Sequence, residues 1–89
     1  MSSQLHILHV EDDEEYSRFI SIQLNNIAKR NKSDRLIFDL VKSPGLGIQK
    51  IRNNRYDCVL CDYQLIGGTG LYFLYNIRPQ GMELPLIFL

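Results

Sequence analysis

The stretch "VLCDYQLIGGTGL", Val59 to Leu71, decides how the chain is interpreted. Its apolar start ends in a single carboxylate, Asp62, and a segment with three glycines follows, Gly67, Gly68 and Gly70. A short apolar run that stops at turn residues is typical of a strand buried on both faces, as in a parallel sheet. Asp62 therefore either begins a turn or is a reactive carboxylate held at the edge of a sheet. The rest of the chain decides between these two interpretations.

Length and composition favour one globular domain. The chain has 89 residues, 45% of them hydrophobic and 22% charged, and its formal net charge is zero. The charge balance argues against a nucleic-acid-binding surface, which needs basic residues. No segment reaches the ~20 apolar residues that span a membrane, and the N-terminus lacks the basic start of a secretory signal. Cys58 and Cys61 would lie on opposite faces of a strand, so we expect free thiols and a cytoplasmic protein.

Apolar patterns along the chain alternate between strands and helices. Four short runs predict strands: Leu5–Val10, Leu36–Val41, Cys58–Cys61 and Leu84–Leu89. Between the first two runs, apolar residues at three- and four-residue steps predict a helix with one apolar stripe: Tyr16, Phe19, Ile20, Leu24, Ile27 and Ala28.

Two shorter helices complete the pattern. Residues 42–47, "KSPGLG", predict a turn before a short helix that ends near Asn53 and Asn54, and Leu71 to Arg78 predict another helix. This alternation implies a parallel sheet with right-handed crossovers and helices on its faces.

Acidic residues follow two of the predicted strands. Glu11, Asp12 and Asp13 follow the first strand, and Asp62 follows the third. Ligands of open parallel sheets bind beyond the carboxyl ends of the strands, so neighbouring strands would bring these carboxylates together. Like charges that close cannot all stay ionised without help, and a divalent cation is the simplest neutralising agent. An all-oxygen ligand set without a calcium-loop motif favours Mg²⁺, and one carboxylate could then form an aspartyl-phosphate.

The same residues also have ordinary structural explanations. Asp12 or Asp13 could cap the helix that follows, and Asp62 could simply begin a turn. His9, inside the first predicted strand, is interpreted as a core histidine with satisfied hydrogen bonds rather than a metal ligand. A shared site is favoured because acidic residues follow both the first and the third predicted strand.

Together these residues resemble the receiver domain of two-component response regulators. The matching pieces are "ILHVEDD" at 7–13, "YDCVLCDYQLIGGTGL" at 56–71 and "LPLIFL" at 84–89, and they occur in the family's order. The resemblance implies an α/β fold of the flavodoxin-like (CheY-like) kind, a doubly wound parallel sheet. It would be incomplete, with three strand–helix units and a fourth strand. Residues 1–89 would then form one receiver domain, truncated at its C-terminal side.

The resemblance also implies a reaction and its residues. In that family a phosphoryl group moves from a histidine of a sensor kinase or phosphotransfer protein to an aspartate after the third strand, which is Asp62 here. Asp12 would bind Mg²⁺ directly, Glu11 would act mainly through water, and the backbone carbonyl of Gln64 would complete the metal ligands with Asp62. Asp13 ranks third among the acids after the first strand. Such a domain is a phosphoacceptor that assists its own modification rather than an enzyme.

The chain departs from the family pattern in two ways. Ile66 stands where the family often has proline. The Ser or Thr after the fourth strand and the Lys after the fifth, which bind the phosphoryl oxygens, would lie beyond Leu89. We therefore expect weak phosphorylation. We also expect dimerisation or strand exchange through Leu84–Leu89, because that segment would form a bare apolar edge.

Two other functions remain open at this point. A small Mg²⁺-dependent phosphohydrolase working through an aspartyl-phosphate needs a second acid two residues after its nucleophile, where Gln64 stands. A purely structural or protein-binding domain would have solvated acids. Replacing Asp62 with Asn should abolish labelling in the receiver and in the phosphohydrolase and change nothing in the structural domain.

Overall fold

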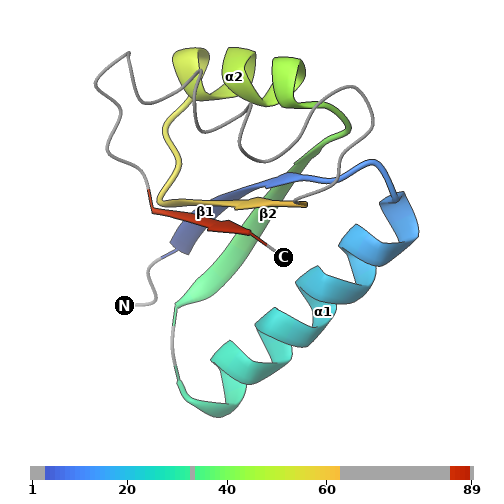
Figure 1. The fold of residues 1–89 in the computed structure, drawn as a ribbon. Helices are drawn as coiled ribbons and strands as arrows, with labels where there is room; N and C mark the ends of the chain where they lie inside the picture. The colour runs from blue at the N-terminus through green and yellow to red at the C-terminus, as the bar shows by residue number, and fades with distance from the viewer. Residues whose placement is uncertain (1–3, 33, 63–84, 89) are drawn as a thin grey trace.

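The computed structural model describes residues 4–32, 34–62 and 85–88 (Figure 1). Within these ranges the chain forms strands and helices in the order β1 (Gln4–Val10), α1 (Glu14–Arg30), β2 (Arg35–Val41), α2 (Pro44–Asn53), β3 (Cys58–Cys61) and β4 (Leu86–Phe88). The helix expected at 71–78 lies outside the described residues, and β4 is described over the centre of the expected strand. No helix in the described ranges is long and apolar enough to cross a membrane.

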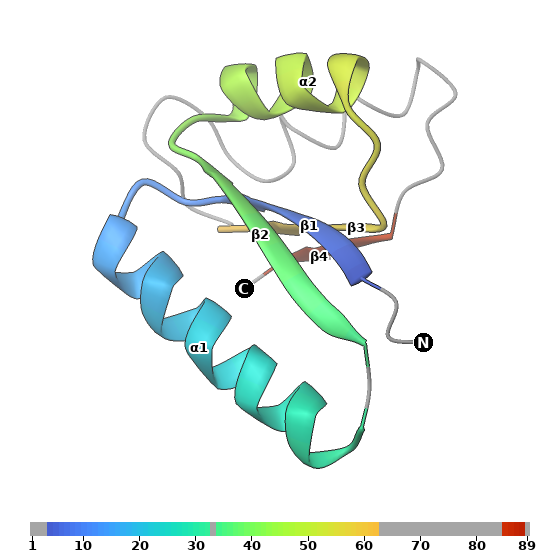
Figure 2. The ribbon, with the colours of Figure 1, turned by 180° about the vertical axis from the view of Figure 1, so that it is seen from behind.

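The strands form one parallel sheet in the order β2-β1-β3-β4. Helices α1 and α2 lie on opposite faces of this sheet, as the two opposite views show (Figures 1 and 2). The parallel sheet with helices on its faces is therefore confirmed. The predicted acidic site required the first and third strands to be neighbours. This is also confirmed, because β1 pairs directly with β3.

The α2 face of the sheet carries the main hydrophobic core. Alternate residues of the two central strands point to this side, so Leu8, Val10 and Val59 are fully buried. The same core includes Val41, Ile48, Ile51, Tyr56 and Cys61. Burial of these side chains fixes the register of β3 against β1, since a shift by one residue would turn each strand's apolar set to the other face.

Helix α1 is rotated relative to the expected apolar stripe. Ser17 is buried, whereas Tyr16, Phe19 and Ile27 are 42%, 56% and 46% exposed. The expected stripe is correct for Ile20, Leu24 and Ala28, which are half-buried, and wrong for the three exposed residues. Polar contacts, and not only apolar ones, lie on the packed side. The Ser17 hydroxyl bonds His9 Nδ1 at 2.8 Å, and the Asn25 side chain bonds the strand β2.

Helix α2 begins earlier than the sequence indicated. The segment 42–47 was expected to be a turn with the helix beginning at Gly47, but Pro44 to Leu46 already belong to the helix. Ser43 caps it, because its Oγ accepts a hydrogen bond from the Leu46 amide at 3.3 Å. Pro44 suits the first helical turn, where its missing N–H would be unpaired anyway.

Candidate functional site

Main-chain hydrogen bonds hold the two acidic segments at the same edge of the sheet. The Glu11 amide donates to the Val41 carbonyl at 2.9 Å, and the Asp62 amide donates to the Val10 carbonyl at 3.0 Å. Each acid that directly follows a strand is thus fixed to the end of a neighbouring strand. Pairing of Val10 with Cys61 then brings the ends of β1 and β3 level.

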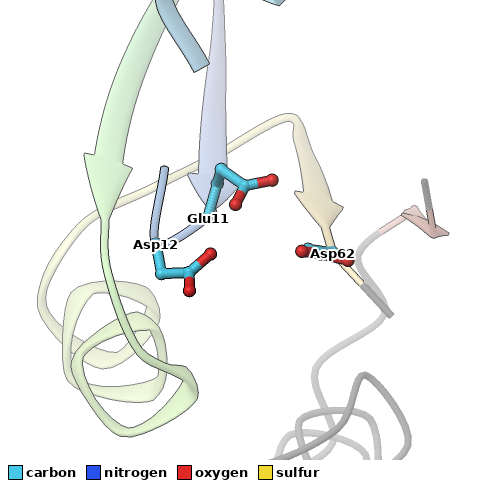
Figure 3. Close-up of side chains that lie close together, drawn as sticks. All are labelled: Glu11, Asp12 and Asp62. Carbon is cyan, nitrogen blue, oxygen red and sulfur yellow. The ribbon is translucent and has the colours of Figure 1, made fainter. Parts of the chain in front are cut away.

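Three carboxylates meet at this edge. Glu11, Asp12 and Asp62 each place a carboxylate oxygen so that all three lie within 4.8 Å of one another. Figure 3 shows Glu11 and Asp12 at the end of β1 and Asp62 facing them from the end of β3. The expected convergence of the two acidic segments is therefore observed.

A pocket of about 360 Å³ surrounds these groups. Its lining is Glu11, Asp12, Asp13, Tyr16 and Asp62. The described lining contains four carboxylates and no basic side chain, so the pocket attracts cations. The apolar pattern assigns Tyr16 to the stripe of the helix, whereas its side chain lines the pocket. Its position three residues after Asp13, in the first helical turn, is the sequence signal for this placement.

Asp13 contributes to the local structure rather than to the carboxylate group. Its Oδ1 accepts a hydrogen bond from the Tyr16 amide at 3.1 Å, and its own amide donates to Glu11 Oε2 at 3.0 Å. The first bond makes it the N-cap of α1. The second orients the Glu11 carboxylate.

Burial and like charges shape the protonation of the site. Glu11 is only 3% exposed, and this burial, with the nearby Asp12 and Asp62 carboxylates, raises its pKa, while the bond from the Asp13 amide opposes the rise. Burial lowers the pKa of His9, only partly opposed by the Asp62 charge, so its ring is neutral near pH 7. The site therefore lacks a cation of its own among these groups.

The ligand chemistry fits Mg²⁺. An octahedral Mg²⁺ with ligands at about 2.1 Å has neighbouring oxygens about 3 Å apart and opposite oxygens about 4 Å apart. The three carboxylate oxygens lie within 4.8 Å of one another, so the three residues could share one metal ion. Oxygen is also the donor that Mg²⁺ prefers, whereas zinc sites favour nitrogen and sulfur. The expected fourth ligand, the Gln64 carbonyl, lies outside the described residues.

The described histidines and cysteines lie outside the group of three carboxylates. His6 is exposed, and His9 lies on the α1 side with its Nδ1 bonded to Ser17. The predicted core position of His9 is confirmed, but its hydrogen bonds are satisfied only in part, because the buried Nε2 has no partner within the described structure. Cys58 and Cys61 are both free, as expected.

No protein-family model and no curated protein matches the sequence. Solved structures do match its fold. The MaeR response regulator bound to beryllium trifluoride shares 20% identity over 100% of this chain, with a TM-score of 0.71. The receiver domain of a Francisella response regulator shares 21% identity over 94% of this chain, with a TM-score of 0.74. A MaeR variant bound to sulfate shares 22% over 98%, with a TM-score of 0.75.

The chain has the fold of a response-regulator receiver domain. It spans 66%, 64% and 67% of the length of these three solved chains, so it corresponds to about two thirds of each. In the described part of the chain, the three carboxylates follow the two central strands, β1 and β3. They lie at the edge of the sheet where open parallel sheets bind ligands.

Proposed function

We propose that this chain is a phosphorelay receiver module in which Asp62 accepts a phosphoryl group. The donor is a phosphohistidine of a sensor kinase or phosphotransfer protein. Glu11, Asp12, Asp62 and the backbone carbonyl of Gln64 hold the Mg²⁺. One observation carries the proposal: the oxygens of Glu11, Asp12 and Asp62 come within 4.8 Å of one another where β1 and β3 end.

Asp62 is positioned to be the nucleophile. Its backbone amide donates a hydrogen bond to the end of β1, and this bond fixes the position of the residue beside the pocket. A carboxylate oxygen of Asp62 attacks phosphorus, the bond from phosphorus to the donor imidazole breaks, and the imidazole leaves with that electron pair. The product is an acyl phosphate on Asp62.

The neighbouring acids prepare the pocket for this transfer. The transition state spreads negative charge over the equatorial phosphoryl oxygens, and Mg²⁺ in the pocket would supply positive charge to offset it. Asp12 and Glu11 would hold the cation. The buried Glu11 carboxylate, whose pKa is raised by burial, gains most from a cation nearby, because the cation stabilises its ionised form.

Phosphorylation with a small-molecule donor tests the proposal. Incubation with acetyl phosphate and Mg²⁺ should add one phosphoryl group to the intact protein, measured by mass spectrometry, and Asp62→Asn should abolish it. Asp13→Asn is the matched control: it makes the same substitution in the same pocket, and asparagine also caps helices, so labelling should persist. Undiminished labelling of Asp62→Asn would contradict the assignment of the acceptor.

The same assay addresses the alternative function. Release of many equivalents of free phosphate per protein would indicate a phosphohydrolase rather than a receiver. We expect at most slow loss of one phosphoryl group per molecule.

A further inference from the structure

Buried polar side chains gather where β1 ends and α1 begins. In the described part of the chain, the buried polar or charged residues are His9, Glu11 and Ser17, which are 0%, 3% and 5% exposed. Two of them bond each other, because His9 Nδ1 lies 2.8 Å from Ser17 Oγ. The third, Glu11, belongs to the group of three carboxylates. A buried polar group costs free energy unless it is paired, so His9 and Ser17 depend on each other for their place in the interior.

Hydrogen bonds connect the His9–Ser17 contact with the Glu11 carboxylate. The Ser17 amide donates to the Asp13 carbonyl at 3.0 Å, at the start of α1. The Asp13 amide in turn donates to Glu11 Oε2 at 3.0 Å. The bonds therefore lead from a ring on β1, through the beginning of α1, back to the carboxylate that directly follows β1.

The position of the Asp13 amide depends on how α1 lies against the sheet. Asn25 attaches α1 to the start of β2, but it follows Asp13 by 12 residues, which is about 18 Å along the helix. A tilt of about 3° around Asn25 would move Asp13 by about 1 Å, enough to stretch a hydrogen bond of 3.0 Å beyond its usual range. Ser17 is only about 6 Å along the helix from Asp13, so its contact with His9 fixes this end of α1.

Other polar contacts near the start of α1 are weaker links to the sheet. The bond from the Tyr16 amide to Asp13 Oδ1 lies within the helix start, so it moves with the helix. The ion pair between Glu14 and Lys42, at 3.7 Å, joins side chains that are each 62% exposed, and such pairs contribute little. Among the described polar contacts, the His9–Ser17 bond is therefore the buried link between this end of α1 and β1.

We propose that His9 and Ser17 are positioning residues for the Glu11 carboxylate. Their contact holds the first turn of α1 against β1, and this places the Asp13 amide where it directs Glu11 toward the other two carboxylates. Neither His9 nor Ser17 lines the pocket, so each acts on a bound ion only through Glu11. The inference rests on the proposed function, because it takes Glu11 as one of the residues that hold Mg²⁺.

Amide resonances test the positioning without any metal ion. In proton–nitrogen NMR spectra of the Mg²⁺-free protein, Ser17→Ala should move the Asp13 amide proton to lower chemical shift, because its hydrogen bond lengthens. The Asp62 amide, which bonds the Val10 carbonyl, should stay in place. Ser17→Thr keeps a hydroxyl at the same position and should restore the Asp13 resonance. An unmoved Asp13 resonance in Ser17→Ala, or equal changes at both amides, would overturn the proposal.

Magnesium affinity tests the consequence for the site. In calorimetric titration with MgCl₂, Ser17→Ala should raise the dissociation constant about tenfold, as loss of a group that orients a metal ligand commonly does, and Ser17→Thr should recover most of the affinity. Ser21→Ala is the matched control, because the Ser21 hydroxyl, one turn later, bonds only the Arg18 carbonyl of its own helix. None of these substitutions changes a charge. Equal dissociation constants for Ser17→Ala and Ser21→Ala would overturn the proposal.

A double variant separates positioning from stability. His9→Leu combined with Ser17→Ala removes both polar groups, so neither is left buried without a partner, and urea unfolding should show stability recovered relative to Ser17→Ala alone. The Mg²⁺ dissociation constant should stay raised, because the link between β1 and α1 is still missing. Recovery of affinity together with stability would show that the contact only maintains the fold, and would overturn the positioning role.

Glu11→Gln distinguishes failure of this inference from failure of the proposed function. It should raise the Mg²⁺ dissociation constant by removing a charged ligand. Loss of affinity in Glu11→Gln with unchanged affinity in Ser17→Ala would overturn the positioning role alone. Unchanged affinity in Glu11→Gln would contradict the proposed function, and the Asp13 amide resonance would then still decide whether His9 and Ser17 position the Glu11 carboxylate.

Discussion

At the scale of single residues, Asp12 and Asp13 are adjacent carboxylates with different roles. Asp13 caps α1 by accepting a hydrogen bond from the Tyr16 amide. Asp12 belongs to the group of three carboxylates with Glu11 and Asp62. The peptide between Asp12 and Asp13 therefore separates a structural acid from a candidate metal ligand.

Substitution should separate these two roles. Asp13→Ala should lower the free energy of unfolding by about 1 kcal/mol, because it removes the cap, and should change Mg²⁺ affinity little. Asp12→Asn should weaken Mg²⁺ binding at least about tenfold by removing a charged ligand, and should leave stability unchanged or slightly raised, because one like charge is gone. Urea unfolding and calorimetric titration with MgCl₂ measure the two quantities. Parallel losses of stability and affinity in both variants would contradict this division.

At the scale of elements, α1 depends on a polar attachment. The Asn25 amide group satisfies both the N–H and the carbonyl of Leu36 where β2 begins, and Asn25 is only half-buried. Together with the His9–Ser17 bond, this contact sets the rotation of the helix against the sheet.

Removal of the Asn25 side-chain amide should lower the free energy of unfolding. Asn25→Ala leaves two backbone groups of β2 without their partner, and we expect the free energy of unfolding to fall by about 1–3 kcal/mol. Asn26→Ala, at the exposed neighbouring position, removes the same side chain without that contact and should change stability by less than about 0.5 kcal/mol. Chemical denaturation of both variants provides the comparison, and similar effects would show that the attachment matters little.

The sequence predicted some elements better than others, for physical reasons. The strands were predictable because β1 and β3 are buried apolar runs, and the convergence of Glu11, Asp12 and Asp62 follows from parallel pairing alone. The rotation of α1 was not predictable, because the polar residue Ser17 faces inward. An apolar pattern alone cannot indicate such a hydrogen-bonded contact. The start of α2 was missed because Pro44 after Ser43 fits both a turn and a capped helix.

At the scale of the whole molecule, the buried Tyr56 hydroxyl and the buried Cys61 thiol make the free energy of unfolding depend on pH in the alkaline range. The Tyr56 hydroxyl donates to the Asp39 carboxylate at 2.7 Å, and burial together with this bond raises the pKa of Tyr56 from 10.0 to about 12. Burial and the nearby Asp62 and Glu11 charges raise the pKa of Cys61 from 9.0 to about 12. In both cases the folded state holds the proton more tightly than the unfolded chain does.

Stability should therefore fall as the pH rises. The contribution of each group is complete below its unfolded pKa and is lost as the pH rises toward about 12, so the decline begins near pH 9 for Cys61 and near pH 10 for Tyr56. Tyr56→Phe should be less stable at neutral pH, by about 1 kcal/mol for the lost hydrogen bond, yet show a shallower decline above pH 10. Urea unfolding across this pH range tests the slope, and identical slopes for the two proteins would refute the assignment.

The amides of Glu11 and Asp62 are bonded to carbonyls of adjacent strands, and this has a consequence for any ion that the pocket takes up. A short peptide copied from either segment would carry the same carboxylates but would have no adjacent strand to align them, so its affinity for Mg²⁺ should be that of a free carboxylate. Occupancy of the pocket would then rise and fall with the cooperative folding of β1, β2 and β3. Under partly denaturing conditions, an ion titration would therefore report the fraction of molecules in which these three strands are assembled.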